Sequence, residues 1–172
     1  ALEATGQGAE ALRAYRRLWL LAPASSFAGR AFERERALVA RGLVAPPLTV
    51  RERVERAERL LASGQATAAG TEMEALVAEG PPPDIALRAL RVTAEAWRRV
   101  GRADDALEAV DRALGLAAGD RRAPWLLERA RLTQGRASDR ALAALDRLLR
   151  EHPSSPEAPE ALLLRAEILE RG

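Results

Sequence analysis

The sequence from position 11 to position 32 reads ALRAYRRLWLLAPASSFAGRAF, and the sequence from position 141 to position 162 reads ALAALDRLLREHPSSPEAPEAL. An offset of 130 residues aligns these two stretches without a gap, and the alignment has eleven identities when it is carried to the end of the chain. Matches of alanine, leucine and arginine arise by chance in a chain rich in them, whereas a shared proline, serine and closing glycine do not. Self-similarity of this kind indicates a chain built from repeated structural units. The identical pairs are Ala11/Ala141, Leu12/Leu142, Ala14/Ala144, Arg17/Arg147, Leu18/Leu148, Pro23/Pro153, Ser25/Ser155, Ala28/Ala158, Ala31/Ala161, Arg41/Arg171 and Gly42/Gly172.

Strong helix formers fill the segments between the turns. The chain of 172 residues is rich in alanine, leucine, arginine and glutamate, and no short run alternates strictly between apolar and polar residues as a half-buried strand would. Apolar residues recur every three or four positions, as at Leu142, Leu145 and Leu149, which predicts amphipathic helices. The sequence therefore predicts an all-α fold. The nine helices that we expect span 8–22, 26–41, 49–63, 66–79, 84–100, 103–117, 122–134, 138–151 and 156–170.

Glycine, proline and small polar residues mark the helix ends. Thr49 and Glu52 have the spacing of a capping box, and Ser155 precedes Pro156, a residue suited to the first turn of a helix. Asp84 follows three prolines that do not fit a helix interior. Six glycines stand where a helix would be closed by a left-handed residue, namely Gly42, Gly64, Gly80, Gly101, Gly119 and Gly135.

Small residues recur around two of these glycines. Ala57 and Ala94 lie seven positions before Gly64 and Gly101, and further alanines follow each glycine by five positions. Alanine at such spacing predicts pairs of helices that cross closely. We expect a single helical-repeat domain over 1–172, with units at 8–42, 49–80, 84–119 and 122–153 and a final half-unit at 156–171.

Composition excludes several kinds of chemistry. The chain has no cysteine and one histidine, which excludes thiolate sites and metal sites built on several histidines. His152 is expected to be a turn residue at a helix end, and the pair Asp104–Asp105 is expected to cap a helix. The longest apolar stretch, 18–24, is too short for a transmembrane helix. We predict no catalytic residues, no metal and no cofactor within this chain.

One cluster of arginines is the candidate binding site. Arg88, Arg91 and Arg98 lie on one predicted helix, together with Arg99, and the only acid among them is Glu95. By the repeat pattern, this helix faces a groove, and the next unit adds Arg122, Trp125 and Arg129 to it. Such a patch suits an acidic partner. Trp19 and Trp97 are expected in the core. Nucleic acid is not the expected partner, because the net charge is only +2 and an aromatic stacking platform is lacking.

The order of turn glycine, alanine, apolar residue and proline at Gly135, Ala141, Leu145 and Pro153 resembles the tetratricopeptide repeat. The resemblance implies helix–turn–helix units that stack into a right-handed superhelix. Within it, Trp97 stands at a position where the repeat usually has tyrosine. Repeats of this kind that grip chaperone carboxylates use lysine and asparagine, and this chain contains neither.

A narrower resemblance covers most of the chain. Residues 11–19, with Pro23 and Ser25 and then the stretch from Arg53 to Gly64, are similar to the helical superhelix that precedes the catalytic domain of soluble lytic transglycosylases. The closing segment 152–161 is similar to the same proteins and to other bacterial envelope repeat proteins. The resemblance implies a periplasmic or cell-envelope scaffold, which positions a separate catalytic module or contacts peptidoglycan glycan strands.

Catalysis is not expected from these residues even if the resemblance holds. Lytic transglycosylases use a catalytic glutamate that is commonly followed by serine, and no Glu-Ser dipeptide occurs here. Because the chain starts at Ala1, we expect a processed product or a piece of a longer enzyme. The alternative is a stand-alone tetratricopeptide adaptor that binds an acidic or extended peptide. The wide apolar face of the last helix, with Leu162, Leu163, Leu164, Ile168 and Leu169, predicts a partner for this helix, such as a second copy.

Overall fold

Helices account for most of residues 7–171, the part of the chain that the computed structural model describes. This part contains nine α-helices, one short 3-10 helix and no strand, so the prediction of an all-α fold is confirmed. No helix of the described residues is both long and apolar enough to cross a membrane. The elements are α1 (Gly8–Leu21), α2 (Ala28–Ala40), α3 (Val50–Ala62), α4 (Ala66–Ala78), α5 (Pro83–Arg99), α6 (Ala103–Leu116), η1 (Gly119–Arg122), α7 (Ala123–Thr133), α8 (Ser138–Glu151) and α9 (Ala158–Arg171).

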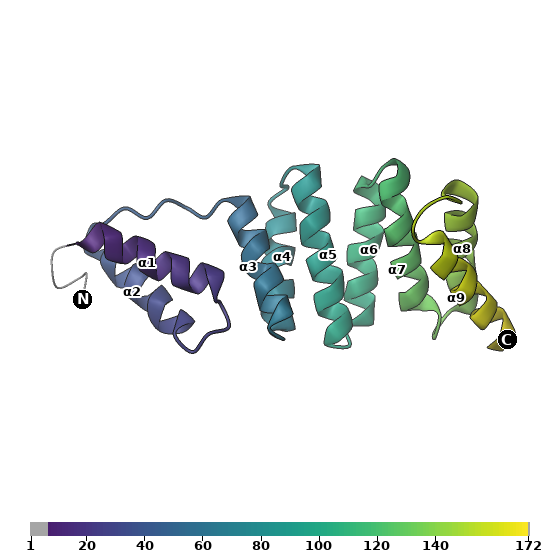
Figure 1. Cartoon of the computed structure of the whole chain (residues 1–172), viewed down its shortest axis with the longest axis horizontal. Coiled ribbons are helices and arrows are strands. Elements are labelled where there is room, and N and C mark those ends of the chain that lie inside the picture. Colours follow the sequence, from purple (N-terminus) through teal and green to yellow (C-terminus); the bar gives the residue numbers. More distant parts are fainter. Residues whose placement is uncertain (1–6, 172) are drawn as a thin grey trace.

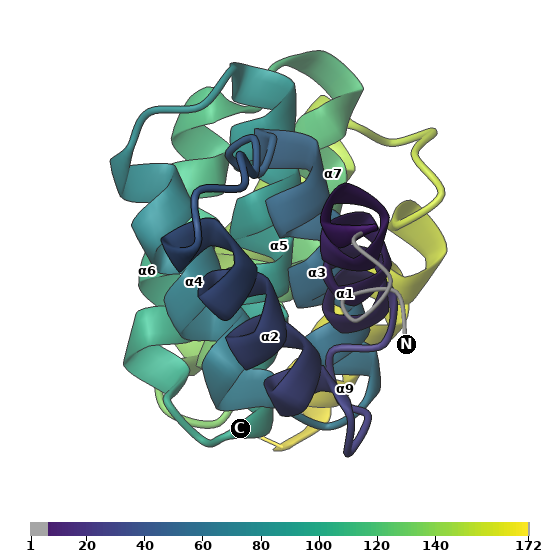
Figure 2. The ribbon, with the colours of Figure 1, turned by 90° about the vertical axis from the view of Figure 1, so that its left-hand side faces the viewer.

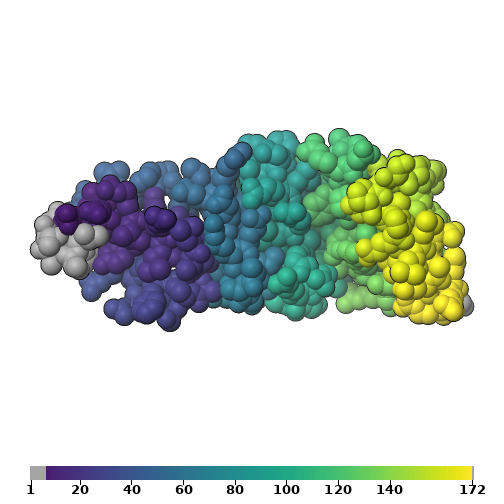
Figure 3. All heavy atoms as spheres, viewed as in Figure 1, coloured from purple at the N-terminus to yellow at the C-terminus, as the bar shows by residue number. Residues whose placement is uncertain are grey.

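The helices follow one another along the long axis of an elongated molecule (Figure 1). From α3 onward each helix contacts the next, and α3 also contacts α5. In Figure 1, α3, α5, α7 and α9 lie nearer the viewer and α4, α6 and α8 lie behind them, and Figure 2 separates α4 and α6 from α3 and α7 in the same way. The space-filling view shows that these helices form a continuous body (Figure 3).

The first two helices form a hairpin with its own small core. The buried residues of α3 to α9 make one continuous apolar cluster, whereas those of α1 and α2 make two separate small ones. An extended stretch joins this hairpin to α3. Within the hairpin, Trp19 Nε1 of α1 donates a hydrogen bond to Glu35 of α2. Between the hairpin and α3, the guanidinium of Arg56 lies 5.3 Å from the centroid of the Trp19 ring. Trp19 is buried, as predicted, and so is Trp97.

Helix ends agree with the predicted signals in most places. The capping box is formed, since Glu52 N donates to Thr49 Oγ1 at 3.2 Å and Thr49 N donates to Glu52 Oε2 at 2.8 Å. Five of the six predicted glycines have positive φ angles. The prediction is wrong for Gly135, because Thr133 O accepts hydrogen bonds from the backbone N–H groups of Arg136 and Ala137, and this turn needs no left-handed residue.

The alanines at the predicted crossings are fully enclosed. Ala57, Ala69, Ala94 and Ala106 are all buried, which confirms their place between closely packed helices. Gly70 is also buried on α4, where it faces the ring of Trp97 on α5. A Cβ atom at this position would lie 2.9 Å from Cζ2 of Trp97.

The two ends of the chain repeat each other in structure as well as in sequence. Adding 130 to the bounds of α1 gives those of α8, and the starts of α2 and α9 correspond in the same way. Both connections are closed by the same backbone hydrogen bonds, from Ser25 N to Ala22 O and from Ser155 N to His152 O. These turns delay both following helices by two residues, so α2 and α9 begin at Ala28 and Ala158 instead of 26 and 156.

Candidate functional site

A groove of about 710 Å³ runs between α5 and α7. Its apolar floor is formed by Leu87 and Ala94 from α5 and by Pro124 and Trp125 from α7. Trp125 is half-buried, so one side of its ring rests on the core and the other side is open to the groove. The groove exists because α6 contacts both α5 and α7 from behind and leaves their front faces unfilled.

The structure brings only half of the predicted site residues to this groove. Arg88, Arg91 and Trp125 line it, and Arg98 lies just beyond its edge. Arg122 and Arg129 are not among the lining residues. Arg122 Nη1 donates to the carbonyl of Ala117 at 3.5 Å, and Arg129 Nε lies 2.9 Å from Asp111 Oδ1 on α6.

The arginines of α5 contact a larger number of acids than the sequence alone indicates. Glu58 of α3 accepts a hydrogen bond from Arg88 Nη2 at 3.0 Å and lies 3.8 Å from Arg91 Nη2. Arg99 donates to Glu95 at 2.6 Å and to the carbonyl of Leu61. The expected cluster with a single acid is therefore a set of ion pairs, some within α5 and some between α5 and α3. Only Arg91 remains mostly in solvent, with 70% of its side chain exposed.

The rim of the groove carries charges of both signs. Arg88 lies in the first half of α5 and Arg91 at its middle, Arg121 lies just before α7, and the acid Asp84 lies in the first turn of α5. Farther along these helices the rim carries Glu95 and Glu128 together with Arg131. The rim therefore carries arginines and acids along its whole length, and most of them are paired with each other or with Glu58 of α3.

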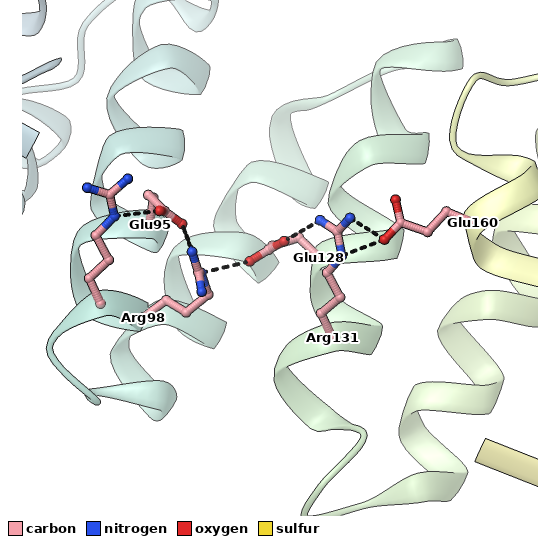
Figure 4. Close-up of polar contacts among 6 residues, drawn as sticks. Glu95, Arg98, Glu128, Arg131 and Glu160 are labelled. Atoms are coloured by element: carbon pink, nitrogen blue, oxygen red, sulfur yellow. Dashed lines mark hydrogen bonds and ion pairs between the residues drawn. The ribbon is translucent and has the colours of Figure 1, made fainter. Parts of the chain in front are cut away.

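A ladder of ion pairs links α5, α7 and α9 beside Glu95 and Glu128 (Figure 4). Arg98 contacts Glu95 at 2.6 Å on its own helix and Glu128 of α7 at 3.8 Å. Arg131 of α7 contacts Glu128 at 3.1 Å and donates a hydrogen bond to Glu160 of α9. Pairs of this kind add little stability singly, but a connected series fixes the spacing of the helices that carry it.

These contacts shift the pKa of two ladder groups. Burial works to raise the pKa of Glu95, but hydrogen bonds from Arg98 and Arg99 outweigh it and hold that pKa below the ordinary value for glutamate. The hydrogen bond to Glu160 raises the pKa of Arg131, which stays charged at every accessible pH. Glu95 and Arg131 are thus both ionised at neutral pH.

The remaining candidate residues lie outside the groove. His152 ends α8, as predicted, and is buried with its Nδ1 3.4 Å from Asp120 Oδ1. The acidic pair does not cap α6 through a side chain: Asp105 accepts a hydrogen bond from Arg102 Nε at 2.8 Å instead, and Asp104 pairs with Arg136. Among the described residues no three histidine or acidic side chains gather in a way that could hold a metal ion.

Comparisons with models of protein families, with curated protein sequences and with solved structures gave no match to this chain.

Proposed function

We propose that this chain is a non-catalytic helical-repeat scaffold and that the groove between α5 and α7 binds a polypeptide segment. The observation that carries the proposal is Trp125, a large aromatic side chain half-open on an apolar floor and surrounded by a charged rim. Rigid aromatic side chains in such settings supply much of the binding energy of protein interfaces. An occupant with an apolar anchor and an acidic residue near Arg91 would satisfy both parts of the groove.

We also propose that the helices are tetratricopeptide-like units that stack into a right-handed superhelix. Support comes from the buried alanines at the helix crossings, the left-handed glycines after α3 and α5, and the repeated connection at the two ends of the chain. In such a stack the first helices of successive units line one side, which is where α5 and α7 form the groove.

In its fullest form, the proposal is that the scaffold is the superhelical region of a bacterial lytic transglycosylase in the periplasm or envelope. Its groove would then hold a segment of the separate catalytic module, and its surface would contact peptidoglycan glycan strands. This form is supported by the resemblance of residues 11–64 and 152–161. The adaptor alternative is favoured by one observation: Arg91 and Arg121 are exposed beside Trp125, where they suit an acidic peptide supplied by another protein.

A selection with a displayed peptide library tests the groove. Peptides that bind the purified chain are measured again on Trp125→Ala and Arg91→Glu, with Phe27→Ala as the control because Phe27 is an exposed aromatic residue far from the groove. Loss of the anchor should weaken binding by about 30-fold, as removal of a hot-spot residue worth about 2 kcal/mol does. Selected peptides that bind all these variants equally would refute the assignment of the groove.

Co-sedimentation with purified peptidoglycan separates the two forms of the proposal. A transglycosylase scaffold that contacts glycan strands should pellet with the insoluble polymer, whereas a peptide adaptor should stay in the supernatant. The same assay with Trp125→Ala shows whether the glycan uses the groove or another part of the surface.

A further inference from the structure

The hairpin of α1 and α2 and the stack of α3 to α9 are held together by few apolar contacts. The two small clusters of the hairpin do not join the core of the stack, and α1 is the hairpin helix that packs against α3. From α3 to α9, by contrast, neighbouring helices share one core. A part of a protein with few buried apolar contacts to the rest opens at a lower free energy than the core does.

The extended connection between α2 and α3 is fixed to the hairpin along most of its length. Leu43, Ala45 and Leu48 all pack on the small clusters of the hairpin. Arg16 of α1 also donates a hydrogen bond to the carbonyl of Pro46. The connection up to Leu48 therefore belongs to the hairpin, although Figure 1 shows it running across to the start of α3.

The stack begins immediately after Leu48. Thr49 caps α3 through the capping box with Glu52, and Val50 packs on the core of the stack. Thr49 is therefore the one residue at which the chain passes from the hairpin to the stack. It is exposed and extended, with φ −68° and ψ 153°. Hinges between rigid parts of a protein are often a few residues at the end of such an element.

The space between the hairpin and the stack is not filled by side chains. A hollow of about 370 Å³ lies between α1 and α3, with Arg13 and Arg17 on one side and Glu52 and Glu55 on the other. Among the described residues, no hydrogen bond or ion pair joins α1 to α3 across this hollow, since Glu55 pairs with Arg59 of its own helix. The hairpin therefore has room to turn without breaking a polar contact there.

Arg56 of α3 is the side chain that holds the hairpin in place. Its guanidinium lies 5.3 Å from the centroid of the Trp19 ring and forms an ion pair with Glu72 of α4. Trp19 is in turn fixed within the hairpin by its hydrogen bond to Glu35. Because the attraction between a cation and an aromatic ring is modest, one such contact can hold two parts of a protein together and still be released.

We propose that residues 8–48 turn as one rigid unit about Thr49, and that Arg56 holds this unit against α3 in the arrangement described above. The released arrangement is a minor population, because the contact of Arg56 with Trp19 is lost in it. The groove between α5 and α7 lies wholly within the stack. The movement therefore leaves the groove unchanged, and this inference does not depend on what the groove binds.

Distances between pairs of spin labels test the movement. The chain contains no cysteine, so labels attach only to introduced ones, and four exposed alanines provide sites. Ala37→Cys with Ala75→Cys joins α2 to α4 across the hinge. Ala14→Cys with Ala37→Cys lies within the hairpin, and Ala75→Cys with Ala143→Cys lies within the stack. In double electron–electron resonance, both internal pairs should give one narrow distance distribution, whereas the pair across the hinge should show a second population.

Removing the contact with Trp19 should enlarge that second population. Arg56→Ala should raise its ratio to the held population by about fivefold, as loss of an interaction of about 1 kcal/mol does. Arg59→Ala is the matched control, because Arg59 lines the same hollow but pairs with Glu55 on its own helix, and it should change nothing. Circular dichroism confirms that each variant is folded.

Three results would overturn the proposal. The first is a distribution across the hinge that is as narrow as both internal ones, in the unsubstituted background and in Arg56→Ala alike. The second is a broad distribution for the pair within the hairpin, since the hairpin would then unfold instead of turning. The third is an equal effect of Arg59→Ala and Arg56→Ala, which would remove the role assigned to the contact with Trp19.

Discussion

Replacing Gly70 with alanine should destabilise the fold, although alanine is the better helix former. A Cβ atom at this position would lie 2.9 to 3.1 Å from three atoms of the Trp97 ring, which is closer than carbon atoms normally approach. The ring cannot move freely. It is buried, its Nε1 donates to Glu74 at 2.6 Å, and the guanidinium of Arg102 lies 3.9 Å from its centroid.

Two opposing effects determine how much Gly70→Ala changes the free energy of unfolding. Overpacking a dense core costs about 1–3 kcal/mol, and exchanging glycine for alanine within a helix contributes about 1 kcal/mol of stability. For Gly70→Ala, the net loss should be about 1 kcal/mol. Gly115→Ala in α6 is the matched control, because nothing lies within 4 Å of its added Cβ atom, and this variant should be stabilised. Urea unfolding followed by circular dichroism measures both changes, with equal m-values as the condition for comparing them.

Making Gly70→Ala in the variant Trp97→Phe tests whether contact with the Trp97 ring causes the loss of stability. Phenylalanine at position 97 lacks the benzo ring atoms that the new Cβ atom would approach, so in Trp97→Phe the Gly70→Ala change should cost less or become stabilising. The coupling between the two changes isolates their contact. If Gly70→Ala were as stabilising as Gly115→Ala, or if its effect were the same in both backgrounds, the packing argument would be refuted.

Three further predictions concern the start of α3, the ladder and the first hairpin. Thr49→Ala removes the capping box and should lower the free energy of unfolding by about 1 kcal/mol, measured in urea, whereas Thr49→Ser should lose much less. Because the folded-state pKa of Glu95 lies below its unfolded value near 4.5, its contribution to stability is complete above that pH and is lost as the pH falls through the folded-state pKa. Glu95→Gln should therefore flatten the acid side of the stability profile, and an unchanged profile would contradict the assignment. A fragment spanning 47–171 should remain helical and unfold cooperatively in thermal melts, because its core is continuous without α1 and α2.

Local signals in the sequence predicted the helices well. Proline, glycine and capping residues act within one turn of a helix, so most helix ends were placed within one or two residues. The predicted local structure is wrong where the conformation of a turn determines how a helix ends. In the η1 segment and at Gly135, the backbone takes a path that no single residue type specifies.

The candidate site could be predicted only in part, because its charges come from distant segments. Glu58 lies 30 residues before Arg88, and nothing in the repeat pattern indicates that they meet. The misplacement of Arg129 has a different cause. Successive residues point about 100° apart around a helix, so Arg129 lies about 40° around α7 from Trp125, on the side away from Glu128. There it pairs with Asp111 on α6 and does not reach the groove.

Leu18 and Leu148 also show that burial depends on segments distant in the sequence. The two leucines share their residue type, their place in a helix and the turn that follows, and sequence reasoning treats them alike. One is nevertheless buried and the other is partly open, since burial depends on whether a helix such as α7 lies alongside. A repeat in sequence therefore predicts conformation, which is local, and leaves the interfaces to be found in three dimensions.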